Sequence, residues 1–239
     1  MLDTMLKHIE KSVPTIVDLE TLLTKIPALS PESGGEGELD KCEALEKWLK
    51  AKGIVHLERH DAPDTRAKGG VRPNLIASIA GESDTKRLWI MSHTDVVPPG
   101  DLAMWNSDPW TLVQKDGRLI GRGVEDNQQG LTASVMAALS LVENKITPPH
   151  TVKLLFVADE EMGSEYGIQW LLANRDLFRK DDMVVIPDGG DEKGETIEVA
   201  EKNLLWLRIM TKGKQCHGSR PDLGANAHSG SSRTCGSSP

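Results

Sequence analysis

The sequence has no long apolar run, no signal-peptide pattern and no excess of basic residues. No apolar stretch approaches the roughly 18 residues that a transmembrane helix needs. The N-terminal segment MLDTMLKHIEKSV has no apolar signal-peptide core. A formal net charge of −8 disfavours nucleic acid or an anionic membrane as the main partner, because both require a cationic face. These absences predict a cytoplasmic protein that binds neither nucleic acid nor membrane.

Cysteine is also scarce, and no two cysteines form a C-x-x-C pair. Cys42, Cys216 and Cys235 are odd in number and widely spaced. This pattern excludes a disulfide framework, and we expect the reduced thiols that are typical of cytosolic proteins.

The composition is that of an ordinary folded domain. Apolar residues make up 38% of the 239 residues, which is enough for a buried core, and 27% are charged. The length allows one large domain, or a core domain followed by the start of a second.

Helical and strand-like patterns alternate along most of the chain. Apolar residues have helical spacing over 2–27, where Pro14 should begin or kink a segment, and over 40–52 and 127–144. Short runs rich in β-branched residues predict strands at 54–58, 74–79, 87–92, 151–158 and 183–187. Several runs are almost continuously hydrophobic, as strands buried on both faces are. The alternation predicts an α/β fold with a mixed, largely parallel sheet and helices on both faces.

The pattern changes after Asp188. Residues 204–214 (LLWLRIMTKGK) alternate in the manner of an edge or antiparallel strand. Residues 229–239 (SGSSRTCGSSP) have no period and cannot pack a core, so we expect a disordered tail. The predicted division is a first domain over 1–203, the start of a second over 204–228, and the tail.

Acidic residues or histidine directly follow three of the predicted strands. His93 and Asp95 come after the third run, Asp159, Glu160 and Glu161 after the fourth, and Asp188 after the fifth. In open α/β sheets, ligands bind in the crevice outside the carboxyl ends of the strands. Asp126 precedes the long helix, so its carboxylate can point into the same crevice.

Each of these motifs has a simpler explanation when taken alone. A histidine after a strand is often structural, an aspartate before a helix is usually an N-cap, and adjacent glutamates are usually solvated. Together they would accumulate negative charge, which is costly unless cations neutralise it. One imidazole with several carboxylates is a ligand set for zinc, with manganese or cobalt as substitutes. The combination predicts a metal site.

The chemistry of such a site assigns roles to individual residues. Two neighbouring metal ions need a bridging carboxylate, and Asp126 is placed for that role. His93 and Asp188 would complete one metal position, and Glu161 would serve the other.

Two further residues would act beside the metals. Asp95 would accept a hydrogen bond from the histidine and hold its tautomer. Glu160 would accept the proton of the attacking water and later pass it to the leaving amine.

Five separated motifs, in order, resemble one known family. They are HTDVVP (93–98), GRGVEDNQQG (121–130), FVADEEMGSE (156–165), PDGG (187–190) and GKQCHGSRPDLGANA (213–227). The resemblance is to the acetylornithine deacetylase and succinyl-diaminopimelate desuccinylase family of dinuclear zinc metallopeptidases, which includes aminoacylases and carboxypeptidases. It implies that His93 and Asp188 bind one zinc ion and Glu161 the other, that Asp126 bridges them, and that Glu160 is the general base.

The resemblance also implies a domain arrangement. In this family an α/β catalytic domain is interrupted by a smaller α+β lid domain that often dimerises. His217 is similar to the family histidine that reaches the active site of the opposite subunit, where it stabilises the oxyanion. The alternative is that His217 is simply a loop residue.

The sequence departs from the family in several places. Family members are considerably longer, and after the lid they add strands, contacts to the substrate carboxylate and one more histidine ligand. Without that histidine the second metal would have Asp126, Glu161 and water. We therefore expect a fragment or the product of a disrupted gene. Arg220 replaces a small or apolar residue, and the DNQQG segment lacks the usual lysine before glycine.

The resemblance implies a zinc-dependent hydrolase of N-acyl amino acids or small peptides, forming homodimers through the lid. The alternative is a catalytically incomplete fragment or a metal-binding scaffold. A nucleotide-binding α/β protein has little support, because no G-x-G-x-x-G follows the first strands.

Overall fold

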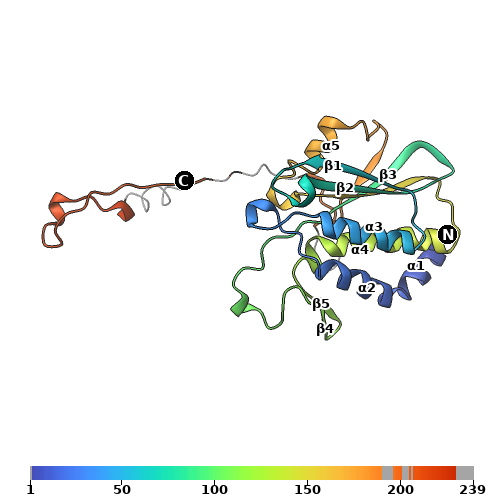
Figure 1. Cartoon of the computed structure of the whole chain (residues 1–239), viewed down its shortest axis with the longest axis horizontal. Coiled ribbons are helices and arrows are strands. Elements are labelled where there is room, and N and C mark those ends of the chain that lie inside the picture. The colour runs from blue at the N-terminus through green and yellow to red at the C-terminus, as the bar shows by residue number, and fades with distance from the viewer. Residues whose placement is uncertain (1, 190–195, 201–204, 206, 230–239) are drawn as a thin grey trace. The chain divides into compact units, whose positions relative to one another are not determined.

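The computed structural model describes residues 2–189, 196–200, 205 and 207–229 (Figure 1). The chain divides into two compact units, Met1–Thr196 and Ile197–Pro239. The first unit contains the sheet and its helices. That the second unit begins a lid domain stays a prediction.

Helices and strands alternate in the first unit, as the sequence predicts. The helices are α1 (Leu2–Glu10), α2 (Val13–Thr24), α3 (Leu39–Ala51), α4 (Gly130–Glu143) and α5 (Ile168–Asn174). The strands are β1 (Leu57–Pro63), β2 (Val71–Ile79), β3 (Ser83–His93), β4 (Val113–Lys115), β5 (Arg118–Ile120), β6 (His150–Val157) and β7 (Met183–Val185). Pro14 lies in the first turn of α2, where its missing N–H costs no helical hydrogen bond.

Five strands form one mixed sheet in the order β1-β2-β6-β3-β7. β3 pairs in parallel with both β6 and β7. β2 is antiparallel to β1 and to β6. The predicted mixed sheet is therefore confirmed, and its parallel part is the β6-β3-β7 half.

Helices cover both faces of the sheet, which confirms the predicted layers (Figure 1). Along β6, Leu154 and Phe156 pack in the core with α2, α3 and α4. The alternate residues Leu155 and Val157 pack on the other face, with Leu171 of α5. This alternation follows from the two-residue period of a strand.

A hairpin and a short helix were not anticipated, and one predicted strand is wrong. The hairpin β4–β5 turns at Asp116 and Gly117, both with positive φ, which is the Asp-Gly turn that favours a hairpin. The short helix α5 was also missed. Described residues within 204–214 form no strand, because only Lys214 has a pairing partner, Ala225, in an isolated bridge.

Several other predictions concern the termini and the cysteines. Within the part of the chain that the structure describes, no helix has both the length and the apolar character needed to cross a bilayer. Cys42 is buried, Cys216 is partly exposed, and both are free thiols. Cys235 and residues 230–239 of the predicted tail lie outside the described residues.

A buried ion network joins β2, the start of α3 and the loop after β6. Arg72 of β2 has no exposed side-chain surface, and it forms two hydrogen bonds with the equally buried Glu38, at 2.7 and 2.5 Å. Its guanidinium also donates to Asp159 Oδ1 at 3.1 Å. Asp159 adopts a left-handed conformation and accepts a hydrogen bond from the Tyr166 amide. The network therefore fixes the loop that continues into Glu160.

We expect Arg72→Met to lower the free energy of unfolding by about 3–5 kcal/mol, because it leaves Glu38 and Asp159 buried without their cation. The matched control is Arg59→Met, which removes an exposed arginine from the neighbouring strand and should cost no more than about 1 kcal/mol. Urea denaturation of both variants measures the difference. Equal losses would contradict the assigned role of the network.

Two further buried ionisable residues lie on α2 and α3. Glu20 and Lys41 are both almost fully buried. Burial raises the pKa of Glu20 to about 7, although the Thr132 hydroxyl and the Lys41 charge partly oppose this shift. Burial likewise lowers the pKa of Lys41 to about 8. Ionisation of Glu20 in the folded state is therefore unfavourable.

This shift predicts how stability changes with pH. Between about pH 4.5 and 7 the unfolded chain loses the Glu20 proton while the folded chain keeps it, so stability falls as the pH rises. Glu20→Gln should remove this contribution, which is on the order of 3 kcal/mol. Unfolding free energies measured across this pH range for the variant, the wild type and the exposed control Glu143→Gln test the prediction. Parallel curves for all three proteins would contradict it.

Candidate metal centre

The predicted site residues lie at the carboxyl ends of three parallel strands. His93 is the last residue of β3. Glu160 and Glu161 open the short turn η5 (Glu160–Met162), just after β6 ends, and Asp188 follows β7. Because β6, β3 and β7 run in the same direction, these side chains come to one edge of the sheet.

Asp126 reaches the same place from the turn that precedes α4. It lies in the irregular turn η4 (Val124–Gln129), immediately before α4, with a non-helical φ of −108° and ψ of 101°. Its peptide bond to Asn127 is cis. Its carboxylate Oδ1 lies 2.8 Å from Nε2 of His93.

His93, Asp126 and Asp188 form a compact triad of possible metal ligands. One ligand atom from each lies within 4.8 Å of the others. His93 is buried and both aspartates are exposed. Nε2 of His93 is also 3.7 Å from an oxygen of Asp188 and 3.8 Å from an oxygen of Glu160. These are the three residues that the sequence assigns to the first metal position and its bridge.

The electrostatics of His93 show how strongly the site attracts positive charge. Burial alone would lower the pKa of its imidazole, but the Asp95 carboxylate, followed by Asp188 and Glu160, raises that pKa to about 10. A proton on His93 thus neutralises part of the carboxylate cluster. A metal ion bound to a neutral imidazole would meet the same demand for positive charge.

The same crowding of carboxylates makes ionisation of Glu160 and Glu161 less favourable. Burial raises the pKa of Glu160, with further help from Asp188 and against the opposing charge of His93. Burial, and then the neighbouring Asp126 carboxylate, raises the pKa of Glu161 to about 7. One imidazole and several carboxylates that repel one another are a donor set that fits zinc.

Asp95 is buried and connects the histidine to the two glutamates. Its backbone oxygen lies 3.0 Å from Nδ1 of His93. Its carboxylate accepts the backbone N–H of Glu160 at 3.0 Å and that of Glu161 at 3.1 Å. With the proton on Nδ1, Nε2 of His93 is directed toward Asp126. Asp95 therefore orients both the imidazole and the loop, where the sequence predicted only the first of these roles.

Asn127 is a site residue that the sequence analysis missed. Its buried side-chain amide donates to Oδ1 of Asp188, and also to the Pro187 carbonyl at 3.0 Å. A Cβ at the adjacent Gly130 would overlap that same carbonyl, so glycine permits the close approach of these segments. The DNQQG segment contains both residues, but sequence spacing did not indicate a contact with the segment after β7.

His217 belongs to the second unit. It is exposed, and its Nδ1 lies 2.9 Å from the Ser219 hydroxyl. Its predicted action at the active site of an opposite subunit stays a prediction.

Comparison with known proteins gives consistent matches. The sequence profile of peptidase family M20/M25/M40 matches residues 89–225. An uncharacterized metallohydrolase of Methanocaldococcus jannaschii is 40% identical over 88% of this chain and 53% of its own length. Succinyl-diaminopimelate desuccinylase 2 of Shewanella loihica is 29% identical over 86% of this chain and 51% of its own length.

A solved structure shows the same fold. Human carnosine dipeptidase 1 aligns with a TM-score of 0.66 at 22% identity, covering 79% of this chain and 41% of that protein. The chain spans about half the length of the curated relatives that it matches. The extent of the profile match, together with the 40% identity to the archaeal metallohydrolase, shows that the chain belongs to peptidase family M20/M25/M40.

Proposed function

We propose that this chain carries the catalytic centre of a zinc-dependent hydrolase that cleaves amide bonds in N-acyl amino acids or small peptides. The observation that supports this most directly is the triad of His93, Asp126 and Asp188, with Glu160 at its side. Family membership supports the reaction class, and the names of the desuccinylase and dipeptidase relatives support the substrate class.

In this proposal the chain's own residues hold two zinc ions. His93 and Asp188 would hold the first ion, Glu161 would hold the second, and Asp126 would serve both. Bound zinc would supply Lewis acidity and lower the pKa of a water molecule that acts as nucleophile. Cobalt or manganese would suit the same oxygen and nitrogen donors. The Asn127 amide, which donates to Asp188, orients that carboxylate.

Glu160 is proposed to transfer the protons. Its carboxylate lies at the edge of the triad. Its pKa is raised toward neutral pH, and a group whose pKa is near the working pH can both accept and return a proton. Asp95 fixes the backbone of Glu160 and so limits where its carboxylate can lie. His217 would stabilise the oxyanion across a homodimer formed through the second unit.

A non-catalytic metal-binding unit is the rival proposal. It draws support from the second metal position, to which only Asp126 and Glu161 are assigned among the described residues. Two bound metals with amide turnover would favour the hydrolase. At most one metal without turnover would favour the scaffold.

Replacing the proposed base should separate catalysis from metal binding. Glu160→Gln should keep the metal content and lower kcat about 10²–10⁴-fold, because it removes a positioned general base. Glu165→Gln, a nearby exposed glutamate, is the control and should keep full activity. Metal analysis and amide hydrolysis are measured together in a form of the protein that turns over substrate. Normal turnover by Glu160→Gln would refute the proposed mechanism.

Loss of the amide that supports Asp188 should weaken metal binding without removing a ligand. We expect Asn127→Ala to lower zinc affinity about 10–100-fold, since residues that orient ligands contribute that much. Asp188→Asn should reduce affinity further. The control Asn144→Ala removes an amide at the end of α4 that donates to the Ser140 carbonyl, and it should leave the zinc affinity unchanged.

Titration calorimetry with zinc in a competing chelator measures these affinities. Unchanged affinity in both Asn127→Ala and Asp188→Asn would show that the triad does not hold the metal.

A further inference from the structure

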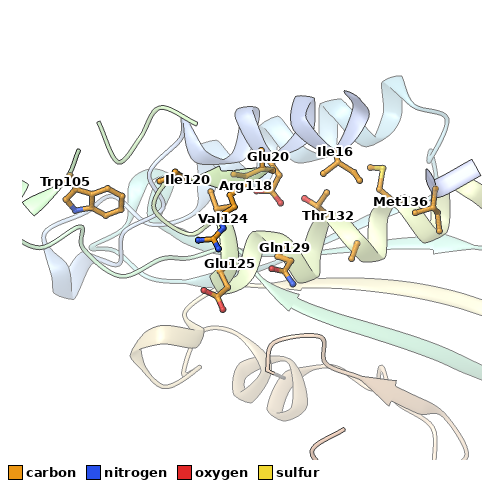
Figure 2. A pocket seen from close by; sticks show the side chains of 14 residues that line it. Ile16, Glu20, Trp105, Arg118, Ile120, Val124, Glu125, Gln129, Thr132 and Met136 are labelled. Atoms are coloured by element: carbon orange, nitrogen blue, oxygen red, sulfur yellow. The ribbon is translucent and has the colours of Figure 1, made fainter. Parts of the chain in front are cut away.

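A pocket separate from the metal centre lies on the helical side of the first unit. It has a volume of about 800 Å³ and is bordered by α1, α2, α4, β5 and the turn η4 (Figure 2). None of the three triad residues is among the described residues that line it. Its volume is in the range of pockets that bind small molecules.

Most of the pocket wall is apolar. Side chains from different parts of the fold contribute to it, among them Ile16, Trp105, Ile120, Val124 and Met136. Figure 2 shows these side chains spread along the pocket, with Ile16 and Met136 beside the helices and Trp105 at the opposite end. Such a wall suits an elongated apolar molecule, because burial of its hydrocarbon surface is favourable.

Two buried polar side chains interrupt this apolar wall. Glu20 comes from α2 and Thr132 from α4, and each is only 2% exposed. Neither Glu20 Oε2 nor Thr132 Oγ1 has a partner with hydrogen-bond geometry among the described residues, although the Thr132 hydroxyl is near enough to lower the pKa of Glu20. Figure 2 shows the two side chains on facing helices. A ligand atom that donates hydrogen bonds would satisfy both oxygens, which otherwise remain unpaired at a cost.

The charges around Glu20 favour a cationic donor over a neutral one. Lys41 is the cation that acts on Glu20, but it also acts on Glu38 and Asp95. The Lys41 charge is thus shared among three carboxylates, of which Glu38 is also paired with Arg72. At the pocket wall, Arg118 of β5 and Glu125 of η4 carry opposite formal charges.

We propose that this pocket is a second binding site, which accepts an elongated apolar molecule ending in a protonated amine. The amine donates hydrogen bonds to Glu20 and Thr132, and the hydrocarbon part lies along the wall between α2 and α4. The site is independent of the proposed hydrolase activity, since its contacts involve none of the metal-centre ligands.

Matched probes of equal length test the proposal with the full chain. Octylamine and octanol differ only in the end group, and titration calorimetry gives the affinity of each. Octylamine should bind at least about tenfold more tightly than octanol, because a hydrogen bond to a charged group contributes that much. Equal affinities, or no octylamine binding by the wild type, would overturn the proposal.

Two variants locate the binding. Glu20→Gln should weaken octylamine binding about tenfold and leave octanol binding nearly unchanged. This variant removes a desolvated charge, so its fold should be at least as stable as the wild type. Ala133→Trp should abolish binding of both probes by filling the pocket from an exposed position of α4.

The controls are Glu143→Gln, which replaces an exposed carboxylate of α4, and Glu160→Gln at the metal centre. Both should bind octylamine as the wild type does. Octylamine binding that survives both Glu20→Gln and Ala133→Trp, or that is lost in Glu160→Gln, would place the amine elsewhere and refute the site.

Discussion

Parallel pairing of β3 with β6 on one side and β7 on the other brings three strand ends to one edge of the sheet. The register places His93 opposite Val157, so the loop that follows β6 begins beside the imidazole. Glu160 and Asp188 then approach it from the two neighbouring strands. A shift of register would separate these side chains, and the donor set for a metal would not exist.

Bringing carboxylates together in this way creates a charge problem that the rest of the unit partly solves. Arg72 and Lys41 are buried cations, and both interact with Glu38. Arg72 also fixes Asp159, and the carboxylate of Asp95 is held by two backbone amides. These groups stabilise the loop geometry. The exposed carboxylates of the triad, Asp126 and Asp188, would be further stabilised by a cation, and this makes the centre suitable for a metal.

Much of the fold could be read from the sequence, because strands buried on both faces are recognisable as continuous apolar runs. The runs at 87–92 and 151–158 correspond closely to β3 and β6. His93 and Asp188 follow from the same logic, since a polar residue after such a run must lie at the strand end, whereas Asp126 was recognised from its place before the long helix. Asn127 was missed because its role depends on a contact with Asp188, 61 positions away.

The family followed from the resemblance of five motifs. The α/β layers and the candidate ligands followed from residue chemistry and local spacing, since each run or motif involves residues that are close together in the chain. The strand order, the antiparallel β1 and β2, and the Arg72 network were decided only by the tertiary structure. The same is true of the pocket, where Glu20 and Thr132 meet from different helices. At such positions, residues distant in sequence bury the side chain and supply its hydrogen-bonding or ionic partners. No local sequence pattern indicates which segments will pack together.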